Sequence, residues 1–135
     1  MALEVATRYE LLPAHPRSAA VARDRVRGLL AAWGLADLAE AAELVTAELI
    51  SNAVKVSEPD GQVGLGVYRS TAGVSAGVVV EVWDAERRPP RLLDAGPDDI
   101  GGRGLMLVGL LTREWGYRRP ATGGKVVYAV VDAPM

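Results

Sequence analysis

The stretch ELVTAELISNAV, residues 43–54, is an apolar helical pattern interrupted by two polar side chains, Glu48 and Asn52. The two are four residues apart, so in a helix both point to the same place, and Lys55 continues this polar edge. At 100° per residue, the apolar positions beside that edge share one stripe, formed by Ala42, Val45, Leu49, Ala53 and Val56. The pattern predicts a helix with a core on one side and a polar edge beside it.

Glu48 and Asn52 have the chemistry of a metal or catalytic site. An amide oxygen can ligate a cation, and a carboxylate can orient or deprotonate a water or a hydroxyl. A solvated helix edge, with an ordinary hydrogen bond between the two side chains, has the same pattern and is common. The low helix propensity of asparagine favours a functional reason, but this helix alone leaves both interpretations open.

The composition is that of an ordinary globular domain, and it excludes several classes of function. The chain has 135 residues and a formal charge of −2, so we expect one domain, residues 1–135, with no general attraction to nucleic acid or to anionic lipid. The absence of cysteine excludes thiolate catalysis, and a single histidine, His15, excludes a Ser-His-Asp triad. With no membrane-spanning apolar run and no signal peptide, we expect a cytoplasmic protein.

Apolar periodicity and turn residues predict the element order β-α-α-β-β-loop-α-β-β. We expect strands at residues 3–11, 62–70, 74–85, 114–119 and 123–133, and helices at residues 18–33, 37–56 and 103–113, the second of them capped by Asp37. The long connection 86–102 has a length that is usually functional or disordered. Strands in adjacent pairs favour an α+β two-layer sandwich, in which a mixed, largely antiparallel sheet carries helices on one face.

The apolar run VVVEVW, residues 78–83, is followed by Asp84. An aspartate at the end of a central strand is a fixed carboxylate at the edge of the sheet. It can accept a hydrogen bond from an exocyclic amine, such as N6 of adenine. The alternative interpretation is an aspartate that only caps the next turn.

The segment DDIGGRGLMLVGLL, residues 98–111, places Gly101, Gly102 and Gly104 before the predicted helix, and Arg103 adds a positive charge. Glycines let the backbone approach an anion, and a helix N-terminus offers free N–H groups and a favourable dipole. Glycine is also common in loops that bind no ligand, so this pattern is only weakly specific for an anion site. The segment is neither a Walker A loop nor a Rossmann fingerprint, because it lacks the G-x-x-x-x-G-K-[ST] pattern and follows no strand.

In order and spacing, these three features resemble the GHKL (histidine kinase-like) ATPase domain, the fold of histidine kinases and gyrase. The short chain is most similar to the small actinobacterial anti-sigma-factor serine/threonine kinases, on the segments LVTAELISNAV, VEVWDAERRPPRL, GGRGLMLVGLLTREWGY and GGKVVYAVV. The resemblance covers essentially the whole chain. It implies that the protein binds ATP and Mg²⁺.

The resemblance also implies roles for individual residues. Glu48 would be the general base, and Asn52 would hold the Mg²⁺ that bridges the ATP phosphates. Asp84 would accept a hydrogen bond from the adenine amine, and residues 86–100 would form the ATP lid. The phosphates would be bound by the helix edge and the glycine-rich turn, through Lys55, Gly102, Arg103, Gly104 and Leu105.

Several positions depart from the family pattern. Glu86 and Arg88 replace the glycines of the usual D-x-G-x-G motif, so Glu86 could narrow or repolarise the adenine pocket. Val56 stands where many relatives carry histidine. Val126 stands where the last strand often has threonine, and Thr122 nearby could supply the missing hydroxyl. These changes affect the expected nucleotide affinity more than the fold.

Two functions are compatible with the sequence. The first is an ATP-dependent protein serine/threonine kinase that sequesters a sigma factor and phosphorylates an anti-anti-sigma antagonist; the intact Glu48–Asn52 pair supports it. The second is a degenerate GHKL domain that regulates a partner by contact, which Glu86, Val56 and Val126 support. By resemblance we expect a homodimer, with no direct binding to nucleic acid or to a membrane.

Overall fold

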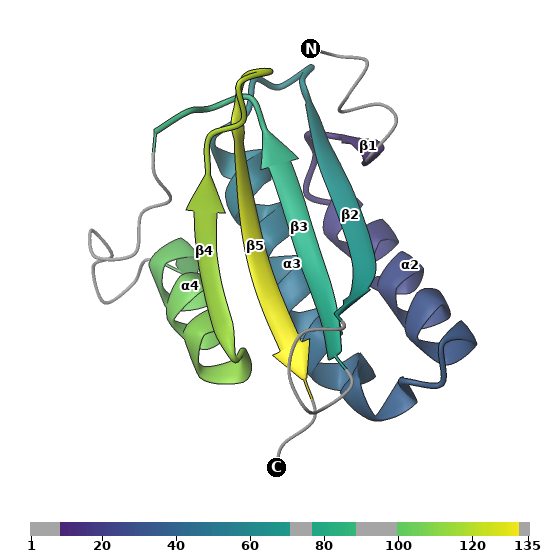
Figure 1. The fold of residues 1–135 in the computed structure, drawn as a ribbon. Helices are drawn as coiled ribbons and strands as arrows, with labels where there is room; N and C mark the ends of the chain where they lie inside the picture. The colour runs from purple at the N-terminus through teal and green to yellow at the C-terminus, as the bar shows by residue number, and fades with distance from the viewer. Residues whose placement is uncertain (1–8, 71–76, 89–99, 133–135) are drawn as a thin grey trace.

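The computed structural model describes residues 9–70, 77–88 and 100–132, with the backbone alone at Ser70 and residues 100–105. It is an α+β two-layer sandwich, as predicted, because one five-stranded sheet carries the helices on a single face (Figure 1). The strand order is β1-β2-β3-β5-β4. In chain order the elements are β1 (Glu10–Pro13), α2 (Ser18–Ala32), the 3-10 turn η1 (Ala36–Leu38), α3 (Ala39–Lys55), β2 (Gln62–Ser70), β3 (Gly77–Asp84), α4 (Ile100–Leu111), β4 (Glu114–Arg118) and β5 (Lys125–Asp132). None of the helices within these ranges is long and apolar enough to cross a membrane.

All neighbouring strands in the described part of the sheet are antiparallel; the sequence predicted a mixed, largely antiparallel sheet. β3 and β4 run in the same direction, but β5 lies between them and runs the opposite way. No parallel neighbours therefore arise. The single sheet with helices on one face is otherwise the predicted architecture.

Most predicted boundaries agree with the structure to within two residues, and three of the differences are described here. β1 runs from Glu10 through Pro13, which an edge strand tolerates because its outer N–H groups need no partner strand; residues 3–8 of the predicted strand lie outside the described residues. α4 begins at Ile100 instead of residue 103, so Gly101, Gly102 and Gly104 lie inside the helix despite the low helix propensity of glycine. Asp37 lies in η1, and the N-cap of α3 is Leu38.

The core between sheet and helices is built from valine, leucine, isoleucine and alanine, as a chain without phenylalanine requires. Alternation along β3 turns every second residue to the helices, namely Val78, Val80 and Val82. The predicted stripe of α3 is buried at four of its five positions, Ala42, Val45, Leu49 and Ala53. The fifth, Val56, is 46% exposed because α3 ends at Lys55, so this residue no longer follows the helical stripe.

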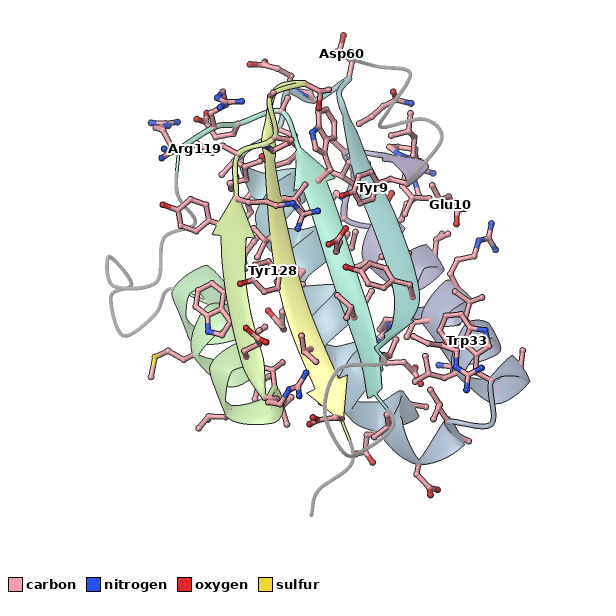
Figure 2. The ribbon with its side chains drawn as sticks, viewed as in Figure 1. Tyr9, Glu10, Trp33, Asp60, Arg119 and Tyr128 are labelled. Atoms are coloured by element: carbon pink, nitrogen blue, oxygen red, sulfur yellow. The ribbon has the colours of Figure 1, made fainter. Side chains whose placement is uncertain are left out.

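The other face of the sheet carries a buried carboxylate. Figure 2 shows Tyr9 and Tyr128 on the face turned away from the helices, and Glu81 pairs with Tyr128 in the register of β3 and β5. Glu81 is 2% exposed. It accepts hydrogen bonds from the hydroxyls of Tyr9 and Tyr68, each at 2.9 Å, and from Nη1 of Arg118 at 3.0 Å. Burial alone would raise the pKa of Glu81, but these hydrogen bonds outweigh burial and hold the pKa below its usual value.

Glu81 is expected to make the stability of the fold pH-dependent in acid. Because its pKa is lower in the folded than in the unfolded chain, its contribution is complete above about pH 4.5, the ordinary value for glutamate, and is lost as the pH falls through the folded-state pKa. Glu81→Gln keeps the shape and removes the charge. We expect it to lower the free energy of unfolding at pH 7 by about 2 kcal/mol, less than for a fully buried pair because Arg118 is partly exposed.

Urea unfolding of both proteins from about pH 7 to pH 3 measures this effect. The variant should lose less stability in acid than the wild type. The control is Glu10→Gln, which removes a carboxylate from the exposed ion pair with Arg25 (3.0 Å) and should cost less than ~1 kcal/mol. An unchanged acid dependence in Glu81→Gln would show that this cluster is not the source.

Candidate functional site

The fold brings parts of six elements toward one end of the molecule. The last residue of β3, Asp84, pairs with the first residue of β5, Lys125, and β2 begins beside them. α3 leads into β2 through residues 56–61, so its C-terminal end lies there too. β4 also finishes at this end, since Arg118 lies opposite Val126. α4 lies beside β4, and its first turn is the one nearer to this end (Figure 1). The predicted site residues lie on these elements, except Thr122, which lies in the turn between β4 and β5.

Asn52 shows the clearest sign of a binding site. Its side chain is half-buried on α3, and its amide nitrogen Nδ2 is buried without a hydrogen-bond partner among the described residues. Leaving a buried donor unpaired costs about 1–3 kcal/mol, so such a group calls for an explanation. An acceptor supplied by a ligand explains it, and the oxygen of the same amide can face a cation.

Glu48 lies one turn before Asn52 and is half-buried. Its carboxylate forms no hydrogen bond or ion pair with another side chain in the described part of the molecule. The ordinary glutamate–asparagine hydrogen bond of a solvated helix edge is therefore not formed. Lys55, one turn after Asn52, is exposed and ends the helix. The polar edge of α3 thus presents a carboxylate, an amide and an ammonium group in a row.

The glycine-rich segment lies inside α4 and not before it. Because α4 begins at Ile100, the N–H groups of its first three residues, 100–102, have no acceptor within the helix. Gly102 is one of these residues, whereas the N–H of Arg103 is used by the helix. Gly104 and Leu105 lie in the second turn, where each N–H is used by the helix. Free backbone donors at a helix N-terminus suit an anion. Of the predicted lid, only residues 86–88 and 100 belong to the described residues.

Asp84 is buried at the end of β3 and already has a cationic partner. Its Oδ1 and Oδ2 accept hydrogen bonds from Nζ of Lys125 at 2.8 and 2.9 Å, and Oδ1 also accepts from the backbone N–H of Glu86 at 2.9 Å. Asp84 is 1% exposed and Lys125 3%. Burial raises the pKa of the Asp84 carboxyl, while the hydrogen bonds and charge of Lys125 oppose that shift. The aspartate does cap its turn, through Glu86; its contact with a base stays a prediction.

A tight turn in front of β5 places Lys125 on Asp84. The N–H of Gly123 donates to the carbonyl of Pro120 at 3.0 Å, and Gly123 and Gly124 have φ of 108° and 73°. A side chain at Gly124 would collide with the carbonyl oxygen of Asp84 and with the indole of the preceding tryptophan. Glycine therefore lets the turn lie directly against the end of β3.

Four hydrogen bonds fix this turn to the chain around the end of β3. The indole Nε1 of Trp83 donates to the carbonyl of residue 123 at 3.1 Å. Nη1 of Arg87 donates to two carbonyls of the turn at 3.1 and 3.2 Å, and Nε of Arg119, labelled in Figure 2, donates to the carbonyl of Arg87 at 2.8 Å. Thr122 lies half-buried in the same turn. Residues 86–88 thus start from a fixed position.

Two of the departures from the family pattern are accounted for by contacts. Glu86 and Arg88, which replace glycines, form an ion pair with each other at 3.0 Å. Val126 follows Lys125 and is buried on the face of the sheet away from the helices, where it packs with Tyr9. Lys125 itself was missed as a partner of Asp84. The signal in the sequence is a lysine after two glycines at the start of the last strand, but only the strand register assigns it to that aspartate.

Comparison with known proteins finds one matching family model and a similar solved structure. The family model described as "Histidine kinase-like ATPase domain" matches residues 12–131. Among solved structures, the histidine kinase domain from the Erythrobacter litoralis EL346 blue-light activated histidine kinase is similar over 71% of this chain and 45% of that one, at 23% identity and a TM-score of 0.47. The chain therefore spans less than half the length of that structure. No curated protein matches the chain.

Gly124 is expected to be essential for the geometry of this end of the sheet. Gly124→Ala introduces a Cβ against the end of β3 at a positive φ, so we expect it to lower the free energy of unfolding by at least ~2 kcal/mol. Gly28→Ala is the matched control, because its Cβ would meet nothing within 4 Å on the exposed side of α2. In that helix interior alanine should stabilise by up to ~1 kcal/mol. Thermal unfolding should move in opposite directions for the two variants; equal shifts would contradict the close approach.

Proposed function

The chain belongs to the family of histidine kinase-like ATPase domains, and from this premise we propose that it is an ATP-binding regulatory protein of the anti-sigma-factor type. In this function it phosphorylates a serine or threonine on an anti-anti-sigma antagonist and sequesters a sigma factor. The proposal extends to a homodimer that acts in the cytoplasm without contacting nucleic acid or a membrane. Its support at the level of sequence is the resemblance of the motifs to the anti-sigma-factor kinases.

The observation that carries the proposal is the buried amide of Asn52. Its Nδ2 lacks an acceptor among the described residues, and it lies one turn from Glu48, whose carboxylate is also unpaired there. α4 packs against α3, the helix that carries both groups. An amide, a carboxylate and a helix N-terminus fit a phosphate chain with a divalent cation.

The composition of the site agrees with Mg²⁺ held mainly by oxygen atoms from outside the protein. No group of three or more histidine, cysteine, aspartate or glutamate side chains gathers within the described ranges. Mg²⁺ keeps several waters and is commonly bound by few protein groups together with phosphate oxygens. In this proposal the oxygen of Asn52 is the protein ligand, and its Nδ2 donates to a phosphate oxygen.

The remaining residues receive roles from their positions. When bound, ATP with Mg²⁺ supplies the phosphoryl group and neutralises its charge. Glu48 accepts the proton of the acceptor hydroxyl. Lys55 and Arg103 attract phosphate oxygens, and the first turn of α4 donates its free N–H groups to them. The wider set assigned to the nucleotide comprises Asp84, Gly102, Gly104, Leu105 and Thr122, with residues 86–100 as the lid.

A second candidate function is favoured by one observation. Asp84 is occupied by Lys125 at 2.8 Å, so the carboxylate expected to bind the base is already paired. A domain of this family with a weak nucleotide site could regulate its partner by contact alone. The two candidates differ in whether ATP binds tightly and is consumed.

Binding of ATP tests the site at Asn52. We expect the wild type to bind ATP with a Kd on the order of micromolar and only with Mg²⁺, and Asn52→Ala to abolish this binding in calorimetric titration. Without nucleotide, Asn52→Ala should be at least as stable as the wild type, because a buried unpaired donor is removed. Leu44→Ala, 41% exposed on the same helix, is the control that should bind normally. If the folded wild-type protein does not bind ATP, the kinase proposal is wrong.

Phosphoryl transfer tests Glu48. With an anti-anti-sigma protein as acceptor and labelled ATP as donor, Glu48→Gln should retain ATP binding and lose transfer by about 10²–10⁴-fold, the usual contribution of a general base. Glu40→Gln, an exposed glutamate in the first turn of the same helix, should transfer as the wild type does. If Glu48→Gln transfers the phosphoryl group as fast as the wild type, Glu48 is not the general base. Binding without any transfer would favour regulation by contact.

A further inference from the structure

The ammonium group of Lys125 has a complete set of hydrogen-bond acceptors. Its Nζ donates to Oδ1 and Oδ2 of Asp84 at 2.8 and 2.9 Å and to the backbone carbonyl of Glu86 at 3.0 Å. An ammonium group has three protons, so each of them has a partner. Lys125 is 3% exposed. Nothing about this group requires a ligand, which distinguishes it from Asn52.

The carboxylate of Asp84 is nearly saturated as well. Oδ1 accepts from Lys125 and from the N–H of Glu86, and Oδ2 accepts from Lys125. A carboxylate offers about four acceptor positions, so one remains, on Oδ2. Its negative charge is also compensated by the lysine. An amine that approaches Asp84 therefore meets a neutral ion pair and not a free carboxylate.

The contribution of the buried Asp84–Lys125 ion pair to the stability of the fold is a weak explanation for its presence. Removing two charges from water costs several kcal/mol per ion, and the attraction between them often only compensates that cost. Apolar residues of similar size at both positions would hold the strands together about as well. The pair also lies at the end of the sheet where the predicted nucleotide residues gather, next to the turn 120–124 that positions it.

We propose that Lys125 occupies the base-recognition carboxylate in the free protein and must be displaced from Asp84 when adenine binds. Lys125 is then a specificity-determining residue that sets both the affinity for the base and the discrimination between bases. This inference rests on the ATP binding proposed above. It concerns one contact within that site.

The chemistry of the bases gives the expected selectivity. A free carboxylate accepts a hydrogen bond from the amine at position 6 of adenine and repels the carbonyl oxygen at the same position of guanine. Adenine gains the hydrogen bond to the carboxylate only by breaking the ion pair with Lys125, which offsets part of that gain. Guanine can bind while the ion pair remains, and the cancelled charges of the pair repel its carbonyl less than a free carboxylate would. The wild type should therefore bind ATP and GTP with similar affinity, within about threefold, since hydrogen bonds to charged groups contribute more than those to neutral ones.

Displacement of Lys125 from Asp84 can be observed directly by NMR, because the chain contains only two lysines, Lys55 and Lys125. In protein labelled with ¹⁵N-lysine, the buried ammonium of Lys125 should give a proton signal protected from solvent exchange, whereas exposed Lys55 should exchange quickly. Saturation with Mg·ATP should abolish the protection at Lys125. Protection that persists while calorimetry shows ATP bound would overturn the proposal and leave the proposed function intact.

A substitution tests the effect on affinity. Lys125→Met should bind ATP about tenfold or more tightly than the wild type and GTP no better, since a hydrogen bond to a charged acceptor is worth about that factor. Because this variant leaves Asp84 buried without its cation, Asp84→Asn/Lys125→Met serves as a second variant without the buried charge. Its amide oxygen can still accept the adenine amine, so it should bind ATP at least as tightly as the wild type.

The control is Arg113→Met, which removes the cation of the ion pair with Asp132 (3.3 Å) at the other end of β5. It should leave both nucleotide affinities unchanged. If both Lys125 variants bind ATP with the same affinity as the wild type, or more weakly, the proposed role of Lys125 is wrong. Absence of ATP binding in the wild type and in both variants would overturn the proposed function together with it.

Discussion

β3 is buried on both faces, and the rest of the molecule depends on how this strand is covered. Toward the helices it presents valines, which need only apolar neighbours. On the other face Glu81 is buried too, and a buried carboxylate needs partners. Tyr9 and Arg118 supply them from segments that lie 72 and 37 residues away in the chain. β3 is thereby connected to the segments at both edges of the sheet by hydrogen bonds on one face, and to the helices by apolar packing on the other.

The elements that the sequence predicted best are those whose pattern is purely local. β2 has the predicted bounds, Gln62–Ser70, and α2 ends before Gly34, whose φ of 71° suits glycine. The differences lie at the ends of elements, which the local pattern does not fix. α4 takes in glycines that favour a loop. Val56 has the chemistry of the apolar stripe but lies just beyond the end of α3.

The candidate site shows the same division. Glu48 and Asn52 could be singled out from spacing on one helix, and the unpaired amide of Asn52 agrees with a binding role. Lys125 could not, because its partner Asp84 precedes it by 41 residues and meets it only through the register of two strands. The residues around Asp84 and Lys125 in the sequence do not indicate how the two strands are aligned. The partners of Glu81 escaped prediction for the same reason.

The short turn 120–124 has a consequence for how this family of chains can vary in length. Side chains alternate between the faces of a strand, so a one-residue insertion or deletion that slipped β5 would turn every side chain of that strand to the wrong face. Lys125 would leave Asp84, and Val127, Ala129 and Val131 would leave the core. Evolutionary changes of loop length are therefore expected to be rare here. Where they occur, they should come in compensated pairs.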